Sequence, residues 1–254
     1  MSNKTLIFII LAIILVGAGA AGYFYWQQTK PLVVPVSNQS NEQMNQNNQS
    51  SLEETNNTAS TSPLTESSGQ CQRDFDQKKL DGNSAIKISG RQAEIDVKNF
   101  GKITVEFYDK DAPKAVTNFL RLTDAGFYDC LTFHRVAKNF VIQGGDPEGN
   151  GTGGISAFGK PFADELNPSS PSYKAGYAKG VLAMANSGPN TNTSQFFIML
   201  GDVSLPNNYT IFGKVLLGQA VVDKIGQVDI TPGMGPTDGA PKVPVVMQSV
   251  KIIK

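Results

Sequence analysis

Hydrophobic and polar residues alternate over two neighbouring stretches, and this pattern predicts a β-hairpin. Every second residue is apolar over 93–97 and again over 103–107, and residues 98–101, Lys-Asn-Phe-Gly, separate the two stretches. Strict alternation places one face of each strand in a core, and a short polar loop with a glycine is typical of a hairpin connection.

The next pattern has helical spacing. Apolar residues recur at i, i+3 and i+4, at Val116, Phe119 and Leu120. Asp111 is predicted to cap the helix, with Pro113 in its first turn and Gly126 at its end, because such residues favour these positions.

The rest of the C-terminal region predicts many short strands. Strand-like runs cover residues 133–143, 181–185, 195–200, 210–215 and 245–253, and 219–225 has the pattern of a second short helix. Gly, Pro and Asn fill the intervening loops. Many short strands with two helices predict a mainly β fold, either a closed antiparallel barrel or a sandwich.

The N-terminal region has a different pattern. Residues 6–26 carry no charge and end in four aromatic residues, and their 21 positions would span about 30 Å as a helix. We expect a transmembrane anchor. A cleavable signal peptide is the alternative, because Ala-Gly-Ala at 18–20 resembles a cleavage site.

Residues 27–70 are predicted to be a disordered linker. The stretch 37–70 contains no aromatic residue, no Lys and no Arg, and Asn, Gln, Ser and Thr dominate it. Such a composition buries too little apolar surface to offset the entropy of ordering. The expected organisation is therefore an anchor at 1–26, a linker at 27–70 and a folded domain at 71–254. Lys4 favours a cytoplasmic N-terminus and hence an extracytoplasmic domain, although Lys30 opposes this orientation.

Composition and charge exclude several functions. The chain has 22 Lys and Arg against 22 Asp and Glu, which argues against non-specific nucleic-acid binding. One His and two Cys are too few for a metal site built on these ligands, and no metal or other cofactor is expected. The common nucleotide-binding and serine-hydrolase motifs are missing.

One Arg lies among several aromatic and amide residues. Arg135 follows His134 in a strand-like run that is otherwise apolar on one face, and Phe140 and Gln143 come shortly after it. Such a set describes an apolar pocket with few polar groups and no evident nucleophile or pair of catalytic carboxylates. His134 is expected to be structural.

Four longer motifs in the C-terminal region resemble those of a known protein family. These motifs are FHRV (133–136), FVIQGGDPEGNGTGG (140–154), VLAMANSGPNTNTSQFFIML (181–200) and IFGKV (211–215). From about residue 91 to 254 the chain resembles the cyclophilin-type peptidyl-prolyl cis-trans isomerases, in particular bacterial ones. The resemblance implies an eight-stranded antiparallel β-barrel that two α-helices close at its ends.

The resemblance also implies the site. Arg135 would be the catalytic donor, and proline-containing polypeptides would be the substrates. The substrate-binding residues would be Phe140, Val141, Gln143, Gly151, Ala185, Asn186, Ser187, Gln195, Phe197, Leu205 and Tyr209. Val141 stands where Met is usual, Tyr209 where His is common and Ser204 where Trp is common, which bears on cyclosporin binding.

Three functions compete at this stage. The first is an anchored, monomeric isomerase that assists the folding of exported proteins. The second is a proline-peptide-binding chaperone or scaffold with incidental isomerase activity, and the third is a purely structural role. An intact Arg135 favours the first, because binding alone does not need it.

The two cysteines are expected to form a disulfide. Cys71 and Cys130 lie in a domain inferred to be outside the reducing cytoplasm, where cysteines pair. The bridge would close a loop of about 60 residues and stabilise the fold by roughly 4 kcal/mol in the chain-entropy model. Two unpaired, buried thiols are the alternative.

Overall fold

The computed structural model describes residues 71–81 and 86–253, and the predicted hairpin opens its sheet. Strands β1 (Gln92–Val97) and β2 (Gly101–Phe107) pair antiparallel, with Ile95 opposite Ile103. Alternate residues of β1 are buried, as the sequence pattern predicted. Asn99 and Gly101 both have positive φ in the turn between the strands, which fits the residue types found there.

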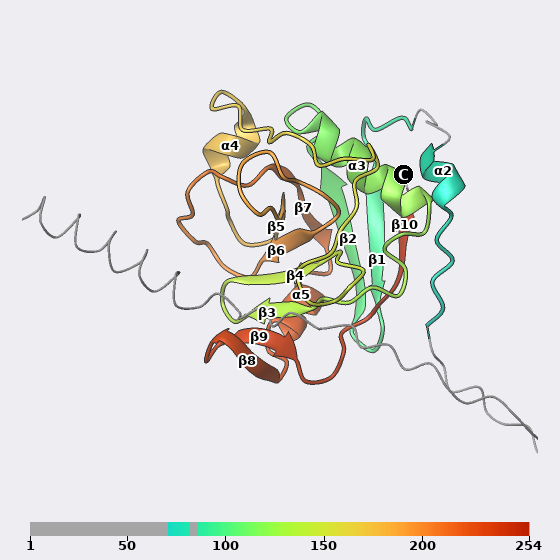
Figure 1. Ribbon diagram of the computed structural model, residues 1–254. Coiled ribbons are helices and arrows are strands. Elements are labelled where there is room, and N and C mark those ends of the chain that lie inside the picture. Colours follow the sequence, from blue (N-terminus) through green and yellow to red (C-terminus); the bar gives the residue numbers. More distant parts are fainter. Residues whose placement is uncertain (1–70, 82–85, 254) are drawn as a thin grey trace, which may run out of the picture. The chain divides into compact units, whose positions relative to one another are not determined.

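The strands form one antiparallel sheet (Figure 1). The other strands are β3 (Arg135–Ala137), β4 (Val141–Gly144), β5 (Val181–Met184), β6 (Phe196–Met199), β7 (Ile211–Leu217), β8 (Ile230–Gly235), β9 (Asp238–Pro241) and β10 (Met247–Ile252). Their order across the sheet is β10-β1-β2-β7-β5-β6-β4-β3-β9-β8. The predicted single strand at 133–143 is two strands, which pair with each other as β3 and β4.

This strand order contradicts the predicted closed eight-stranded barrel. The described sheet has ten strands, and no ladder joins its two ends. An isolated bridge between Thr132 and Val246 brings the residues before β3 beside those before β10. The additional strands β8 and β9 instead extend the sheet beyond β3 (Figure 1).

Four helices are present in the described residues, where two were expected. Helices α3 (Pro113–Asp124) and α5 (Gln219–Ile225) match the prediction, whereas the five-residue helices α2 (Gln77–Asp81) and α4 (Pro171–Ala175) were not foreseen. Single-turn helices are too short for a recognisable apolar repeat.

The predicted cap of α3 is wrong. The N-cap residue is Ala112, and it makes no side-chain cap hydrogen bond. The Asp111 carboxylate accepts a hydrogen bond from the backbone N–H of Ser172 in α4 instead. Glu165, far along the chain, accepts hydrogen bonds from the N–H groups of Lys114 and Ala115, each at 2.9 Å. A tertiary contact therefore satisfies the start of this helix.

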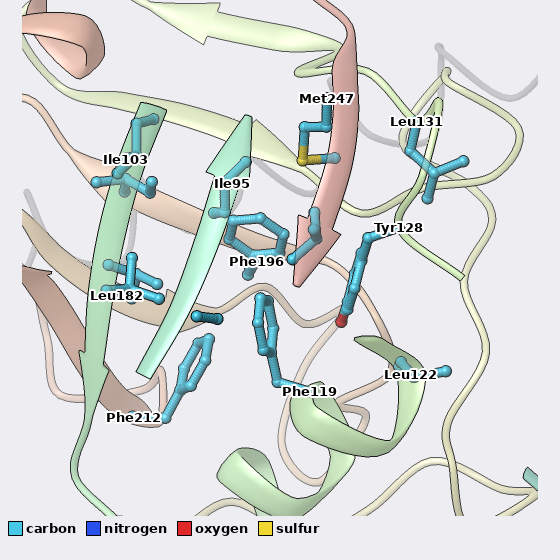
Figure 2. Packing of buried hydrophobic residues seen from close by; sticks show 14 of the residues in the cluster. Ile95, Ile103, Phe119, Leu122, Tyr128, Leu131, Leu182, Phe196, Phe212 and Met247 are labelled. Atoms are coloured by element: carbon cyan, nitrogen blue, oxygen red, sulfur yellow. The ribbon is translucent and has the colours of Figure 1, made fainter. Parts of the chain in front are cut away.

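Aromatic rings fill the core between α3 and the sheet (Figure 2). Phe119 of α3 stacks on Tyr128 at 4.7 Å between ring centroids and meets Phe196 and Phe212 at 5.4 and 5.6 Å. The buried Tyr128 hydroxyl donates a hydrogen bond to the carbonyl of Ser194. The core thereby holds α3 and strands β6 and β7 in place.

The described residues contain no helix with the length and hydrophobicity that a membrane span needs. The expected anchor at residues 1–26 and the expected linker at 27–70 lie outside the described residues.

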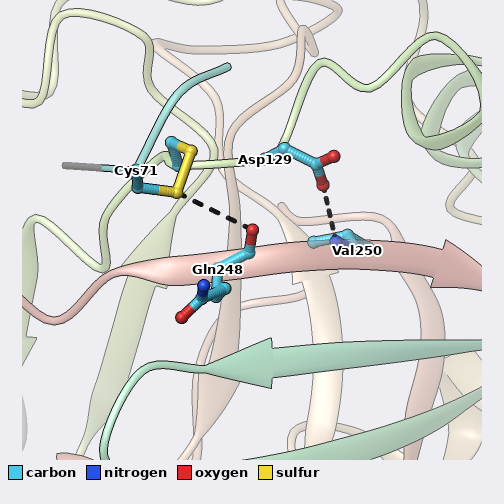
Figure 3. Close-up of a disulfide and its surroundings, with 5 residues drawn as sticks. Cys71, Asp129, Gln248 and Val250 are labelled. Carbon is cyan, nitrogen blue, oxygen red and sulfur yellow. Dashed lines mark hydrogen bonds between the residues drawn. A yellow bond between two sulfur atoms is a disulfide. The ribbon is translucent and has the colours of Figure 1, made fainter. Parts of the chain in front are cut away.

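A disulfide joins Cys71 to Cys130 at a Cα–Cα distance of 5.5 Å (Figure 3). Cys130 has a φ of 64°, in the left-handed region, and its N–H donates to the carbonyl of Met247. Next to it, the carboxylate of Asp129 accepts a 2.7 Å hydrogen bond from the N–H of Val250 in β10 (Figure 3). The bridge thus fixes the first described residue to the edge of the sheet.

Candidate functional site

A pocket of about 600 Å³ opens beside β3 and β4. Ten of the predicted site residues line it: Arg135, Phe140, Val141, Gln143, Gly151, Ala185, Asn186, Phe197, Leu205 and Tyr209. The other two, Ser187 and Gln195, line an adjoining hollow of about 500 Å³ that shares Gln143, Gly151, Ala185 and Asn186 with the pocket. The structure therefore brings all twelve into one continuous groove.

The apolar wall of the pocket belongs to a small cluster of its own. Val141 and Phe197 are buried, and the partly buried Phe140, Leu205 and Tyr209 pack against this cluster. The Phe197 ring meets the Tyr209 ring edge-on at 5.5 Å. This wall suits a small apolar ring such as that of proline.

Cross-strand register positions the polar groups. Arg135 of β3 is directly opposite Gln143 of β4, and Gln143 is directly opposite Phe197 of β6. Directly paired residues point to the same face of a sheet, so the Arg, the amide and the aromatic ring meet at the pocket. Sequence alone could not decide which face each residue takes.

The Arg135 guanidinium is held on two sides. Its Nη1 donates to Oε1 of Gln143 at 2.9 Å. Its Nε and Nη2 donate to the two carboxylate oxygens of Asp238 at 2.8 and 2.7 Å. The side chains of Arg135 and Asp238 are 24% and 20% exposed, so the pair is partly shielded and still reaches the groove.

Gln143 and Gln195 extend this network to the next loop. Nε2 of Gln143 donates to Oε1 of Gln195 at 2.9 Å. Nε2 of Gln195 donates in turn to the carbonyls of Gly151 and Gly153 at 3.1 and 2.7 Å. Gln195 is buried at 7% exposure and acts here as a link between the Arg and the loop.

Asp146 holds that loop from inside. Its carboxylate accepts hydrogen bonds from the N–H groups of Glu148, Asn150 and Gly151. Burial works to raise the pKa of Asp146, but these backbone donors outweigh it and hold the pKa below its ordinary value. The ionised carboxylate thus keeps Gly151 at the edge of the pocket.

Asn186 lines both hollows of the groove, and Ser187 lines the smaller one. Nδ2 of Asn186 donates to the carbonyl of Asn208 at 3.0 Å, and its Oδ1 accepts from the N–H of Gly188. The N–H of Ser187 donates to Oγ1 of Thr191. These contacts fix the loops beside the pocket.

His134 is buried at 8% exposure and lines the pocket. Neither ring nitrogen has a hydrogen-bond partner within the part of the chain that the structure describes. Burial lowers the pKa of His134, the Asp146 carboxylate raises it and the Arg135 guanidinium lowers it, with a net lowering. A neutral imidazole is therefore favoured at neutral pH.

The family model for "Cyclophilin type peptidyl-prolyl cis-trans isomerase/CLD" matches residues 92–252, which is more than half of the chain. The chain belongs to this family. It is accordingly a peptidyl-prolyl cis-trans isomerase, as several curated relatives are named.

Curated relatives of this chain are also named peptidyl-prolyl cis-trans isomerases. Peptidyl-prolyl cis-trans isomerase CYP18-2 of Arabidopsis thaliana is 47% identical over 131 residues, which cover 51% of this chain and 77% of the plant protein. Human peptidyl-prolyl cis-trans isomerase-like 1 is 44% identical over 157 residues, which cover 61% of this chain and 86% of the human protein. These relatives are eukaryotic, so they do not support the expected likeness to bacterial members.

A crystal structure of a Cryptosporidium parvum cyclophilin type peptidyl-prolyl cis-trans isomerase has the same fold. It matches with a TM-score of 0.58 and 34% identity, and the match covers 65% of this chain and 98% of that protein. A second structure of the same protein, obtained in the presence of the dipeptide Ala-Pro, matches with a TM-score of 0.57.

The two departures from the family pattern at 141 and 209 fall inside the pocket of this cyclophilin-type enzyme. Val141 and Tyr209 both line it, so they alter the apolar wall. Ser204 is exposed and does not line the pocket.

Strands β8 and β9 add pocket residues that the sequence pattern did not indicate. Gly233, Met234, Asp238, Gly239 and Ala240 also line the pocket. This stretch is rich in Gly and Pro and has no alternating apolar pattern, so its sequence predicts a loop. The pairs Pro232-Gly233, Gly235-Pro236 and Asp238-Gly239 all mark turns, and they are the signal for a hairpin in this stretch.

Proposed function

We propose that this isomerase acts on exported polypeptides outside the cytoplasm, with Arg135 as its catalytic donor and residues 6–26 as its membrane anchor. The observation that carries the proposed catalytic role is the oriented Arg135 guanidinium beside an apolar pocket. The uncharged N-terminal stretch and the Cys71–Cys130 disulfide support the location, because disulfides persist in oxidising compartments.

The chemistry needs no nucleophile. Partial double-bond character of the X–Pro amide creates a barrier of about 18–20 kcal/mol to rotation, and no covalent bond has to break. In the twisted amide the proline nitrogen becomes pyramidal and accepts a hydrogen bond. A donor that contacts this nitrogen only in the twisted state stabilises the transition state and so lowers the barrier. It does not tighten the binding of the ground-state peptide.

An arginine suits this role because its guanidinium stays charged and offers donors in a fixed plane. One or two charge-assisted hydrogen bonds of about 1.5–3 kcal/mol each would supply roughly one to four decades of rate. Phe140, Phe197 and Leu205 would hold the proline ring and exclude water, which strengthens these bonds.

A peptide-binding chaperone or scaffold is the alternative. A binding pocket needs the apolar wall but not a guanidinium that three hydrogen bonds orient. This orientation favours catalysis as the main function. We also propose that the protein is a monomer.

Fractionation of cells that express the full-length chain tests the location. We expect the protein in the membrane fraction, with its original N-terminus retained and its domain accessible to protease only from the extracytoplasmic side. Washed membranes should then accelerate isomerisation of a proline peptide in a protease-coupled assay. A soluble species that begins at Ala21 would replace the anchor with a cleaved signal peptide, and a protein found wholly in the cytoplasm would overturn the proposed location.

A further inference from the structure

Asp238 is the one carboxylate that contacts Arg135 within the described residues, and it comes from the β8–β9 hairpin, which the sequence pattern did not predict. Nε and Nη2 of Arg135 donate to Oδ1 and Oδ2 of Asp238 at 2.8 and 2.7 Å. Two parallel hydrogen bonds fix the plane of a guanidinium as well as its position. The contact therefore restrains the side chain that is proposed to perform catalysis.

Sheet pairing brings the carboxylate to this place. Asp238 of β9 is directly opposite Ala137 of β3, and Ala137 is two residues from Arg135. Residues two apart on a strand share a face, so Asp238 faces the same side as Arg135. Gly239 permits the close approach of β8, because a Cβ there would lie 2.0 Å from the carbonyl oxygen of Thr231.

The arrangement leaves part of the guanidinium for substrate. Arg carries five N–H donors. Two bind Asp238 and one binds Gln143, and the remaining donors, one on each Nη, have no partner among the described residues. The donors that remain lie on a group that is already held on two sides.

We propose that Asp238 is a positioning residue for the isomerase reaction. It holds the Arg135 guanidinium so that the remaining donors face the proline nitrogen when the amide twists, and the β8–β9 hairpin is thereby part of the active site. This inference rests on the proposed role of Arg135.

The physical reason is preorganisation. A free Arg side chain has several rotatable bonds, and ordering it during catalysis costs entropy. The ion pair orders it beforehand. The Asp238 carboxylate also offsets part of the positive charge of Arg135. If this weakening of the charge were its main effect, removal of the carboxylate would accelerate the reaction. The two roles predict opposite changes in kcat.

Steady-state kinetics of the full-length protein test the proposal. We expect Asp238→Ala to lower kcat about tenfold and to change KM by less than about twofold, because the lost restraint acts mainly in the transition state. Asp238→Asn has nearly the same shape and should give a smaller loss of about threefold. Asp223→Asn is the matched control, since Asp223 forms a 2.9 Å ion pair with Lys179 away from the pocket and its removal should leave kcat unchanged.

A double-mutant cycle separates positioning from a general structural role. If Asp238 acts through Arg135, Asp238→Ala should cause no further loss in the Arg135→Ala background. An unchanged or higher kcat in both single Asp238 variants would overturn the proposal, as would the same fold loss in both backgrounds. Should Asp238→Ala fail to fold, Asp238→Asn gives the decision. Full activity of Arg135→Ala would refute the proposed catalytic role itself, which is a separate result.

Discussion

At the scale of single residues, the site is a chain of side-chain hydrogen bonds that begins at Asp238 and continues through Arg135, Gln143 and Gln195 to Gly151. Each amide in this chain donates on one side and accepts on the other, so its orientation is fixed. The loop that holds Gly151 is in turn fixed by Asp146. A rigid donor at the pocket is the consequence, and rigidity is what electrostatic stabilisation of a transition state requires.

Replacement of Arg135 tests the centre of this chain. Arg135→Ala should lower kcat by about tenfold to a hundredfold, whereas peptide affinity should weaken little, because the apolar wall of Phe140, Phe197 and Leu205, proposed to hold the proline ring, is left intact. Isomerisation rate and peptide affinity are measured on the same preparation. Arg91→Ala serves as control, since the Arg91 side chain donates to the Lys87 carbonyl and does not line the pocket.

An equal fall in isomerisation rate and peptide affinity of Arg135→Ala would identify Arg135 as a binding residue and favour the scaffold function.

At the scale of elements, short segments depend on partners that are distant in the sequence. The N-terminus of α3 depends on Glu165, and β9 depends on its pairing with β3. Helix α3 contributes Phe119 to the core against β6 and β7. A local change at the start of α3 is therefore expected to affect the stability of the domain.

Glu165→Ala tests this dependence. The substitution leaves two N–H groups at the start of α3 without their acceptor, and we expect the free energy of unfolding to fall by about 1–2 kcal/mol. Denaturant unfolding monitored by circular dichroism gives the value. Glu94→Ala, which removes an exposed ion pair with Lys102, should have a smaller effect. If both substitutions lowered the free energy of unfolding equally, the Glu165 cap would stabilise the domain no more than an exposed ion pair does.

At the scale of the whole molecule, the disulfide connects the segment before the sheet to the folded body. Cys71 and Cys130 are 59 residues apart in sequence, and neither lines the pocket. The bridge constrains the unfolded chain over a long loop. Its contribution should therefore be to stability rather than to activity.

Removal of the bridge tests this separation. Cys71→Ser should lower the free energy of unfolding by about 2–4 kcal/mol and leave kcat unchanged. Cys71 is the better position for the substitution, because Cys130 has a positive φ that a new residue would have to adopt. Mass measurement of the wild-type protein under non-reducing conditions should find no free thiol. Two free thiols in exported protein would contradict the pairing.

The sequence by itself determined the elements whose residues repeat with a clear period. The alternation in β1 and β2 and the helical spacing in α3 were sufficient, because burial of one face imposes these periods on the residues. Long motifs around Arg135, Phe197 and Asn186 were enough to name the pocket residues by resemblance. The order of residue types along the chain carried this information.

Only the tertiary structure decided the rest. The strand register set which face Arg135 and Gln143 take, and the pairing of β9 with β3 brought Asp238 to the guanidinium from 103 residues away. Glu165 replaced the expected local cap in the same manner. A hydrogen bond between distant segments leaves no period in the sequence, since it depends on how the strands pair and not on the order of neighbouring residues.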